Sequence, residues 1–306
     1  MPKFSIIVPG YNVENYLEDC LSSIFKQTNQ DFEVIFINDG STDKTLEIAN
    51  KYKDDITIIN QENLGLSEAR NNGVKKASGK YLLFVDSDDY IDKELLQRLD
   101  QVTKNNPDLV RFGLNEVVGD KVTPIEAPKF NNLSGVDAFK EIVKNKYVEP
   151  AWLYLYKKDF YINNNFLFIP HVYHEDFGLI PKIIVKADKV TSISYPGYNY
   201  VKRENSIITD ESKINKKIND LLVLGRLMLM EKTESKEYYG FISNSLISTY
   251  KKIKDKSKKK EYYNNLKELK VCNYLLKDTF VRKIKYIICK ISLKFYLKVV
   301  SRWNFP

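Results

Sequence analysis

The sequence predicts an α/β sandwich over its first 112 residues and a mostly helical region at the C-terminal end. Short β-rich runs alternate with segments whose apolar residues recur at helical spacing, as in βαβ units around a parallel sheet. One of these runs, Tyr81–Val85, is apolar at nearly every position, which is typical of a central strand covered on both faces. Beyond residue 211 helical spacing dominates.

The predicted elements of the first 112 residues follow in a regular order. Strands are expected at residues 4–8, 33–37, 56–59, 81–85 and 109–112, and helices at 17–25, 41–52, 66–77 and 92–105. We expect Ser41 or Thr42 to cap the second helix and Gly79 to follow the third as its C′ residue. Residues 117–200 are rich in aromatics and show no regular pattern.

The composition is that of a globular protein, with 43% hydrophobic and 29% charged residues. Cys20, Cys272 and Cys289 are widely spaced, and we expect them as free thiols of a cytoplasmic protein. The first residues predict a strand and not a signal peptide. No apolar run reaches the roughly 18 residues that a membrane-spanning helix needs.

The net charge of +8 is unevenly distributed. Residues 1–250 hold 31 basic and 36 acidic side chains, whereas residues 251–306 hold 17 basic and 4 acidic ones. The basic character therefore belongs to the C-terminal end. A local block of this kind indicates a polyanionic partner, either a lipid headgroup surface or nucleic acid.

Polar residues follow four of the predicted strands, where ligands of open α/β sheets bind. Asp86-Ser87-Asp88-Asp89 comes directly after a buried strand, where neighbouring carboxylates repel one another unless a cation compensates them. Such oxygen ligands suit Mg²⁺ or Mn²⁺. The alternative is an acidic cap for the next helix. Neither a dinucleotide fingerprint nor a P-loop occurs.

Four ordered segments of the chain resemble the successive signatures of family 2 glycosyltransferases. They are Ile7-Val8-Pro9-Gly10-Tyr11-Asn12, Asn38-Asp39-Gly40-Ser41-Thr42-Asp43, Asn63-Leu64-Gly65-Leu66-Ser67-Glu68-Ala69-Arg70-Asn71 and Asp86-Ser87-Asp88-Asp89. The resemblance implies a GT-A fold, a nucleotide-diphosphate sugar donor with UDP preferred, a divalent metal and inversion at the anomeric carbon. It implies a domain at 1–206, with donor binding in 1–112 and the acceptor side in 113–206, and a helical region at 207–306.

The same resemblance assigns donor-binding residues. It places Pro9, Tyr11 and Asn12 at the nucleoside, with Asp39 facing the base. Asn63, Gly65 and Arg70 would line the nucleotide pocket. Asp86 would face the ribose and the sugar, and Asp88 would be the metal ligand. For Pro9 and Gly65, turn formation alone is the structural alternative.

Asp176, in His174-Glu175-Asp176-Phe177-Gly178, resembles the family's catalytic base. An apolar helical pattern follows it, so its carboxylate is expected at a helix N-terminus, where the dipole favours the ionised form. The alternative is that Glu175 and Asp176 only complement that dipole.

Further residues are candidates for contacts with the diphosphate and the acceptor. Arg203 lies in a segment, 198–207, that resembles a diphosphate-contacting part of the family, and Arg suits phosphate. His174, Glu175 and Trp152 are candidates for the acceptor side, and core packing is an equal alternative for Trp152. His171 and His174 lack the further ligands that a zinc site needs.

The C-terminal end predicts a membrane contact. An apolar stripe of Phe280, Ile284, Ile287, Ile288, Ile291 and Phe295 is interspersed with lysines and arginines, and Trp303 and Phe305 follow. This composition is typical of an interfacial helix on anionic lipid. We therefore expect residues 279–306 to hold the protein on the inner face of the cell membrane. A packed helix or a homodimer through the C-terminal helices is the alternative.

The sequence thus predicts transfer of one sugar to a glycan or lipid-linked acceptor in bacterial surface polysaccharide synthesis. No QxxRW motif of the processive synthases occurs. The alternatives are a nucleotidyltransferase that makes sugar nucleotides and a non-catalytic polyanion-binding protein. The first would begin with a glycine-rich basic loop. A nucleic-acid partner is not expected, since the charge avoids the α/β body.

Overall fold

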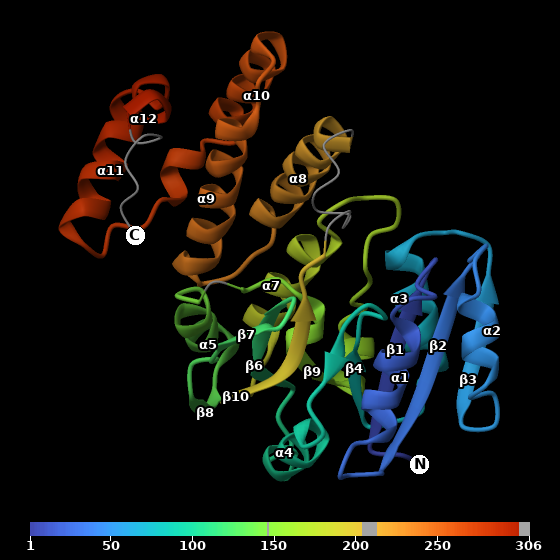
Figure 1. Ribbon diagram of the computed structural model, residues 1–306. Coiled ribbons are helices and arrows are strands. Elements are labelled where there is room, and N and C mark those ends of the chain that lie inside the picture. The colour runs from blue at the N-terminus through green and yellow to red at the C-terminus, as the bar shows by residue number, and fades with distance from the viewer. Residues whose placement is uncertain (146, 204–212, 300–306) are drawn as a thin grey trace. The chain divides into compact units, whose positions relative to one another are not determined.

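The computed structural model describes residues 1–145, 147–203 and 213–299 (Figure 1). The chain divides into two compact units, residues 1–212 (unit 1) and 213–306 (unit 2). The expected domain boundary between residues 206 and 207 falls in 204–212, outside the described residues.

Unit 1 is built on one mixed sheet with the strand order β3-β2-β1-β4-β9-β6-β10-β5, to which β7 adds beside β6 and β8 beside β10 (Figure 1). The strands are β1 Phe4–Gly10, β2 Phe32–Asp39, β3 Ile56–Gln61, β4 Tyr81–Phe84, β5 Tyr90–Ile91, β6 Leu109–Val118, β7 Lys121–Ile125, β8 Phe130–Leu133, β9 Tyr154–Lys157 and β10 Val190–Val201. Strands β1 to β4 pair in parallel, as predicted. Strand β9 runs antiparallel between β4 and β6, so the sheet is not purely parallel.

The helices of unit 1 connect these strands. They are α1 Leu17–Phe25, α2 Thr45–Asn50, α3 Leu66–Lys76, α4 Leu95–Thr103, α5 Gly135–Ile142, α6 Lys158–Asn163 and α7 Glu175–Lys186, with the 3-10 turn η1 at Ala151–Leu153. Helix α3 packs closely on the sheet, since a Cβ at Gly73 would lie 2.4 Å from the Ile7 side chain of β1. This packing fixes the helix that carries Arg70.

Two predicted helix ends were wrong. Helix α2 begins at Thr45 and not after Ser41 or Thr42, because both residues are bonded to Asn12. Gly79 is not the C′ residue of α3, whose C-cap is Ala77. Gly79 instead lies against β1, where an added Cβ would be 2.7 Å from the backbone nitrogen of Ser5.

The segment that looked irregular in the sequence contains the longest strand. Strand β10 has 12 residues and passes through Tyr195-Pro196-Gly197, residues that usually mark turns. Its pairing with β6 shifts register between Ser192 and Tyr198, which accommodates the proline within the sheet. After the shift, β10 brings Tyr198 to the ends of the parallel strands.

Unit 2 is helical, as predicted. Its elements are α8 Ile214–Leu229, α9 Lys236–Lys252, α10 Lys256–Glu268, the 3-10 turn η3 Val271–Tyr274, α11 Phe280–Ile291 and α12 Leu293–Val299. Its core includes Leu224, Tyr238, Leu246 and Leu266. No described helix combines the length and the apolarity that crossing a membrane requires.

The expected single stripe at the C-terminal end is divided between two helices. Ser292 has extended backbone angles, ends α11 and separates Phe295 of α12 from the rest of the stripe. Phe280, Ile287 and Ile291 are 77%, 53% and 80% exposed. Trp303 and Phe305 lie outside the described residues.

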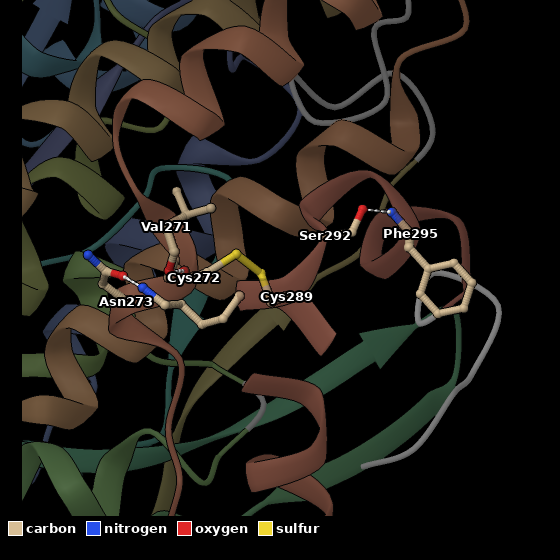
Figure 2. The surroundings of a disulfide bond; sticks show 8 residues. Val271, Cys272, Asn273, Cys289, Ser292 and Phe295 are labelled. Atoms are coloured by element: carbon tan, nitrogen blue, oxygen red, sulfur yellow. Dashed lines mark hydrogen bonds between the residues drawn. A yellow bond between two sulfur atoms is a disulfide. The ribbon is translucent and has the colours of Figure 1, made fainter. Parts of the chain in front are cut away.

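The expectation of three free thiols was wrong for two of them. Cys272 of η3 and Cys289 of α11 form a disulfide, and their Cα atoms lie 5.5 Å apart (Figure 2). The turn between the two elements brings the cysteines together across 17 residues of sequence, which no spacing rule reveals. Cys20 is buried and free.

Candidate active site

The β1–α1 loop forms one wall of the candidate site. Pro9 is buried at the end of β1, and Tyr11 follows with 47% of its surface exposed. Asn12 has a left-handed backbone with φ of 51°. Its backbone nitrogen donates to Ser41 Oγ at 3.1 Å, and its side-chain oxygen accepts from the Thr42 nitrogen at 2.8 Å. The loops after β1 and β2 are therefore joined by Asn12.

Asp39 organises the loop after β3. Its buried carboxylate accepts from the backbone nitrogens of Leu64 at 2.8 Å and Gly65 at 2.9 Å, and from Gln61 Nε2 at 2.7 Å. Gly65 has φ of +89°, a conformation that favours glycine. Asn63 is exposed beside it. Asp39 thus holds in place the loop that the sequence assigned to the nucleotide.

The acidic residues after β4 form a cluster. One carboxylate oxygen from each of Asp86, Asp88 and Asp89 lies within 4.8 Å of the others. The hydroxyl of Tyr198 accepts from the Asp86 nitrogen at 3.1 Å and donates to Asp89 Oδ2 at 2.8 Å. Val201 donates its backbone nitrogen to the other Asp89 oxygen at 2.8 Å. Strand β10 therefore fixes the shape of this loop.

The three carboxylates differ in their availability for a metal. Asp89 is buried, and both its carboxylate oxygens accept hydrogen bonds. Burial, together with the negative charge of Asp86, raises the pKa of Asp89 to about 8. Asp86 and Asp88 are partly exposed. Hard oxygen donors of this kind fit Mg²⁺ or Mn²⁺. Asp88 also pairs with Arg203, whose guanidinium carbon lies 4.4 Å from the centre of the Tyr16 ring.

Asp176 lies at the N-terminus of α7, as predicted. One of its oxygens accepts from the Ala151 backbone nitrogen at 3.0 Å, and the other binds Arg70 at 2.9 Å. The pKa of Asp176 is raised to about 7, chiefly because burial disfavours the charged carboxylate, while Arg70 opposes the rise. The exposed His174 precedes Glu175 with a left-handed φ of 64° and turns the chain into the helix.

Arg70 connects the two acidic groups. Its side chain is 1% exposed. Nη2 binds Asp86 at 2.8 Å, and Nη1 binds Glu175 at 3.0 Å and Asp176 at 2.9 Å. The sequence placed Arg70 among the residues that line the nucleotide pocket. In the structure its terminal nitrogens are occupied by carboxylates.

Trp152 is buried and packs in an aromatic stack. Its ring lies 4.2 Å from the Tyr198 ring and 5.5 Å from the Tyr200 ring, measured between centroids. The sequence left acceptor contact and core packing open for Trp152, and the structure shows it in a core-packing position. Sequence reasoning missed Tyr198, the residue that joins Trp152 to the acidic loop, because nothing in its surroundings along the chain signals a hydrogen bond to Asp89.

The model of the family described as glycosyl transferase family 2 matches residues 5–173, more than half of the chain. The chain belongs to this family. The GT-A type of fold expected from the resemblance is confirmed by the solved structure described below.

Two curated relatives illustrate the family. The chain is 35% identical over 217 residues to "Uncharacterized glycosyltransferase EpsJ" of Bacillus subtilis, a match that covers 68% of this chain and 63% of EpsJ. It is 34% identical over 212 residues to a poly(ribitol-phosphate) beta-glucosyltransferase of Bacillus spizizenii, covering 66% of this chain and 33% of the relative.

The crystal structure of Staphylococcus aureus TarS residues 1–349 in complex with UDP-GlcNAc has a similar fold. The TM-score is 0.72 and the sequence identity 23%, over 89% of this chain and 83% of that one. At this identity the likeness establishes the fold.

Proposed function

We propose that the protein is a metal-dependent, inverting glycosyltransferase that moves one sugar from a nucleotide-diphosphate sugar, with UDP preferred, to an acceptor hydroxyl. The observation that carries the proposal is the meeting of three groups at the carboxyl ends of β1 to β4. These are the Asp39-ordered loop, the acidic cluster around Asp88, and Asp176 at the start of α7.

The donor side follows from the loops. Pro9, Tyr11, Asn12 and the residues around Asn63 and Gly65 would hold the nucleoside, with Asp39 on the base side. Asp88, together with Asp86, would hold a Mg²⁺ or Mn²⁺ ion, which neutralises charge on the departing diphosphate. Arg203 is beside Asp88 and can bind a phosphate oxygen in the same place.

Asp176 is suited to accept the proton of the acceptor hydroxyl. Inversion requires the attacking oxygen and the departing phosphate to lie on opposite faces of the sugar, so the base must stand apart from the metal ligand. Asp176 belongs to α7 and lies outside the acidic cluster of Asp86, Asp88 and Asp89, so we assign it to the acceptor and the cluster to the metal. A pKa near 7 also suits a base that works at neutral pH.

The acceptor is proposed more broadly, as a glycan or a lipid-linked glycan of bacterial surface polysaccharide synthesis. Relatives named as poly(ribitol-phosphate) transferases support this class. Acceptor contacts would fall near His174 and Glu175, which lie next to Asp176.

A screen of nucleotide sugars tests the activity. The full chain is incubated with each UDP-, GDP- and dTDP-sugar, with and without Mn²⁺, and release of the nucleoside diphosphate is measured. We expect metal-dependent release from one nucleotide class. Release of pyrophosphate instead would identify a nucleotidyltransferase, and salt-sensitive nucleic-acid binding without turnover would identify a non-catalytic protein.

We also propose that unit 2 holds the enzyme on an anionic membrane surface, on the cytoplasmic side. Phe280, Ile284, Ile287 and Ile291 recur at i, i+4, i+7 and i+11 and form one exposed face of α11. Cys289 lies on the opposite face, where the disulfide ties α11 to η3. The exposed Lys283 neighbours that face on α11, and the exposed Lys294 follows on α12, so both add positive charge to this end of the chain.

An anionic bilayer is the occupant that this chemistry favours. A second copy of the chain would cover the apolar residues but would bring like charges together, whereas anionic lipid satisfies both features at once. Flotation with phosphatidylglycerol vesicles, with neutral vesicles and across a salt series tests this. We expect binding to anionic vesicles that weakens with salt. Equal recovery with neutral vesicles, or a dimer in solution without flotation, would contradict the proposal.

A further inference from the structure

A single buried cation, Arg70, connects the donor side of the candidate site to the group proposed as the base. We propose that Arg70 is a positioning residue that orients Asp176 and keeps it ionised, and not a direct ligand of the nucleotide. The inference rests on the proposed function and adds a specific role to it.

The contacts of Arg70 show that it is not a surface charge without a structural role. Arg70 projects from α3, which the close contact at Gly73 holds on the sheet. Its two terminal nitrogens point to different segments, Nη2 to Asp86 after β4 and Nη1 to the first turn of α7. Because the guanidinium is a rigid planar fork, fixing one end fixes the direction of the other.

The same geometry leaves little of Arg70 for a ligand. The side chain is 1% exposed, and the Phe168 ring lies 5.1 Å from the guanidinium carbon. Nε is buried and has no hydrogen-bond partner in the described part of the chain. A nucleotide phosphate would have to displace a carboxylate from Arg70 to reach it.

The charge of Arg70 also affects the protonation of Asp176. Three carboxylates surround one guanidinium, so the protein groups of the cluster have an excess of negative charge before a metal ion binds Asp86. Burial and the charges of Glu175 and Asp86 all favour protonation of Asp176, and Arg70 and the Ala151 N–H oppose it. Without Arg70, Asp176 would keep its proton at higher pH and fail as a base at neutrality.

Glu175 shares the same nitrogen of Arg70 and therefore offers a change of opposite sign. Replacing Glu175 with glutamine removes a like charge from beside Asp176 and leaves the guanidinium in place. The proton of Asp176 should then dissociate at lower pH. Two variants with opposite expected shifts separate an electrostatic role from a general disturbance of the fold.

The experiment compares R70K, R70Q and E175Q with the wild type, with R98Q as the matched control. Arg98 also binds a glutamate, Glu94, but on the exposed surface of α4. For each protein, kcat and donor KM are measured from pH 5.5 to 9.5 in Mn²⁺. Carbon NMR of the aspartate carboxyls, assigned by the signal lost in D176N, gives the titration midpoint of Asp176 without turnover.

For R70Q we expect kcat at pH 7 to fall at least about tenfold, donor KM to change less than about threefold, and the midpoint of Asp176 to rise by about one pH unit or more. R70K should show a smaller upward shift than R70Q, E175Q should lower the titration midpoint of Asp176, and R98Q should match the wild type.

A fall in donor affinity parallel to the fall in kcat, with the titration midpoint of Asp176 unchanged, would overturn the inference. Absence of turnover in the wild type would count against the proposed function alone, since the NMR midpoints still decide the role of Arg70. If R70Q does not fold, the shifts of R70K and E175Q decide it.

Discussion

Unit 1 compensates its charges inside the fold, whereas unit 2 exposes them. In unit 1 the buried Arg70 binds three carboxylates, and the buried Arg111 donates to the Tyr154 hydroxyl. In unit 2 the lysines of α10 to α12 are mostly exposed, and a row of exposed apolar residues runs along α11. Buried compensated charge sets the geometry and proton affinity of a site, while exposed charge acts at a distance on other molecules. This contrast predicts that substitutions in unit 1 change catalysis and that substitutions in unit 2 change location.

The largest effect is expected for Asp88→Ala. Removing the proposed metal ligand should lower metal-dependent transfer on the order of 10³-fold, because several kcal/mol of charge stabilisation are lost. Calorimetry with Mn²⁺ and UDP should show that coupled binding disappears. Asp54→Ala, an exposed carboxylate on the same unit, is the control and should behave as wild type. Coupled binding that survives in Asp88→Ala would show that the metal has other ligands.

A smaller loss is expected for Asp176→Asn. The amide keeps the size of the side chain but cannot take a proton, so transfer should fall about 10²-fold or more while UDP affinity is retained. Titration of UDP by fluorescence or calorimetry checks the second part. Loss of UDP binding in step with activity would assign Asp176 to the donor and not to the acceptor.

The pH profile sharpens this assignment. The raised pKa of Asp176, about 7, means that the carboxylate is ionised above that pH and protonated below it. Transfer by the wild type should therefore be full on the alkaline side and fall about tenfold per pH unit below the pKa. The residual activity of Asp176→Asn should lack this acid limb. An acid limb that persists in the variant would belong to another group.

In unit 2 the double variant Ile287→Asp, Ile291→Asp should lower flotation with anionic vesicles about tenfold and leave hydrolysis of the soluble donor unchanged. Each carboxylate opposes insertion of the apolar face and repels anionic lipid. The matched control is Leu227→Asp, Met230→Asp, which places the same charges on two exposed apolar residues, one in α8 and one directly after it. Equal losses in both variants would show that total charge, and not the face of α11, decides binding.

The smallest effect on activity is expected for Cys289→Ser. Without the disulfide, the 17-residue segment between the cysteines is no longer closed into a loop in the unfolded chain. The free energy of unfolding of unit 2 should therefore fall by up to about 3 kcal/mol, with no effect on donor hydrolysis. Thermal unfolding with and without a reductant measures this. Alkylation before lysis, followed by mass spectrometry, shows whether the disulfide is formed in the cell.

The sequence predicted the first half of unit 1 well because that half is built from local patterns. Strands β1 to β4 and helices α1 and α3 follow apolar periodicity, and four motifs mark the strand ends. The strands from β5 to β10 were not predicted, apart from the start of β6. Aromatic residues, Pro196 and Gly197 obscure the alternation of apolar and polar residues that would indicate a strand.

The candidate site was predicted as a set of residues but not as a set of contacts. Asp39, Asp88 and Asp176 all lie where the motifs and the expected elements placed them along the fold. The partners of Arg70 are 16, 105 and 106 residues away in sequence, so no local pattern could reveal that its charge is already engaged. The same holds for Tyr198, which is 109 residues from Asp89.

The wide separation of these partners has a consequence for the evolution of the chain. The β6–β7 hairpin lies between Arg70 and Asp176 in sequence, and its residues from Gly119 to Pro124 are exposed. Substitutions there would leave the buried cluster undisturbed, whereas a change at Arg70 removes a partner of both Asp86 and Asp176. We therefore expect homologues to tolerate changes of length in this hairpin more readily than single substitutions at positions 70, 86 and 176.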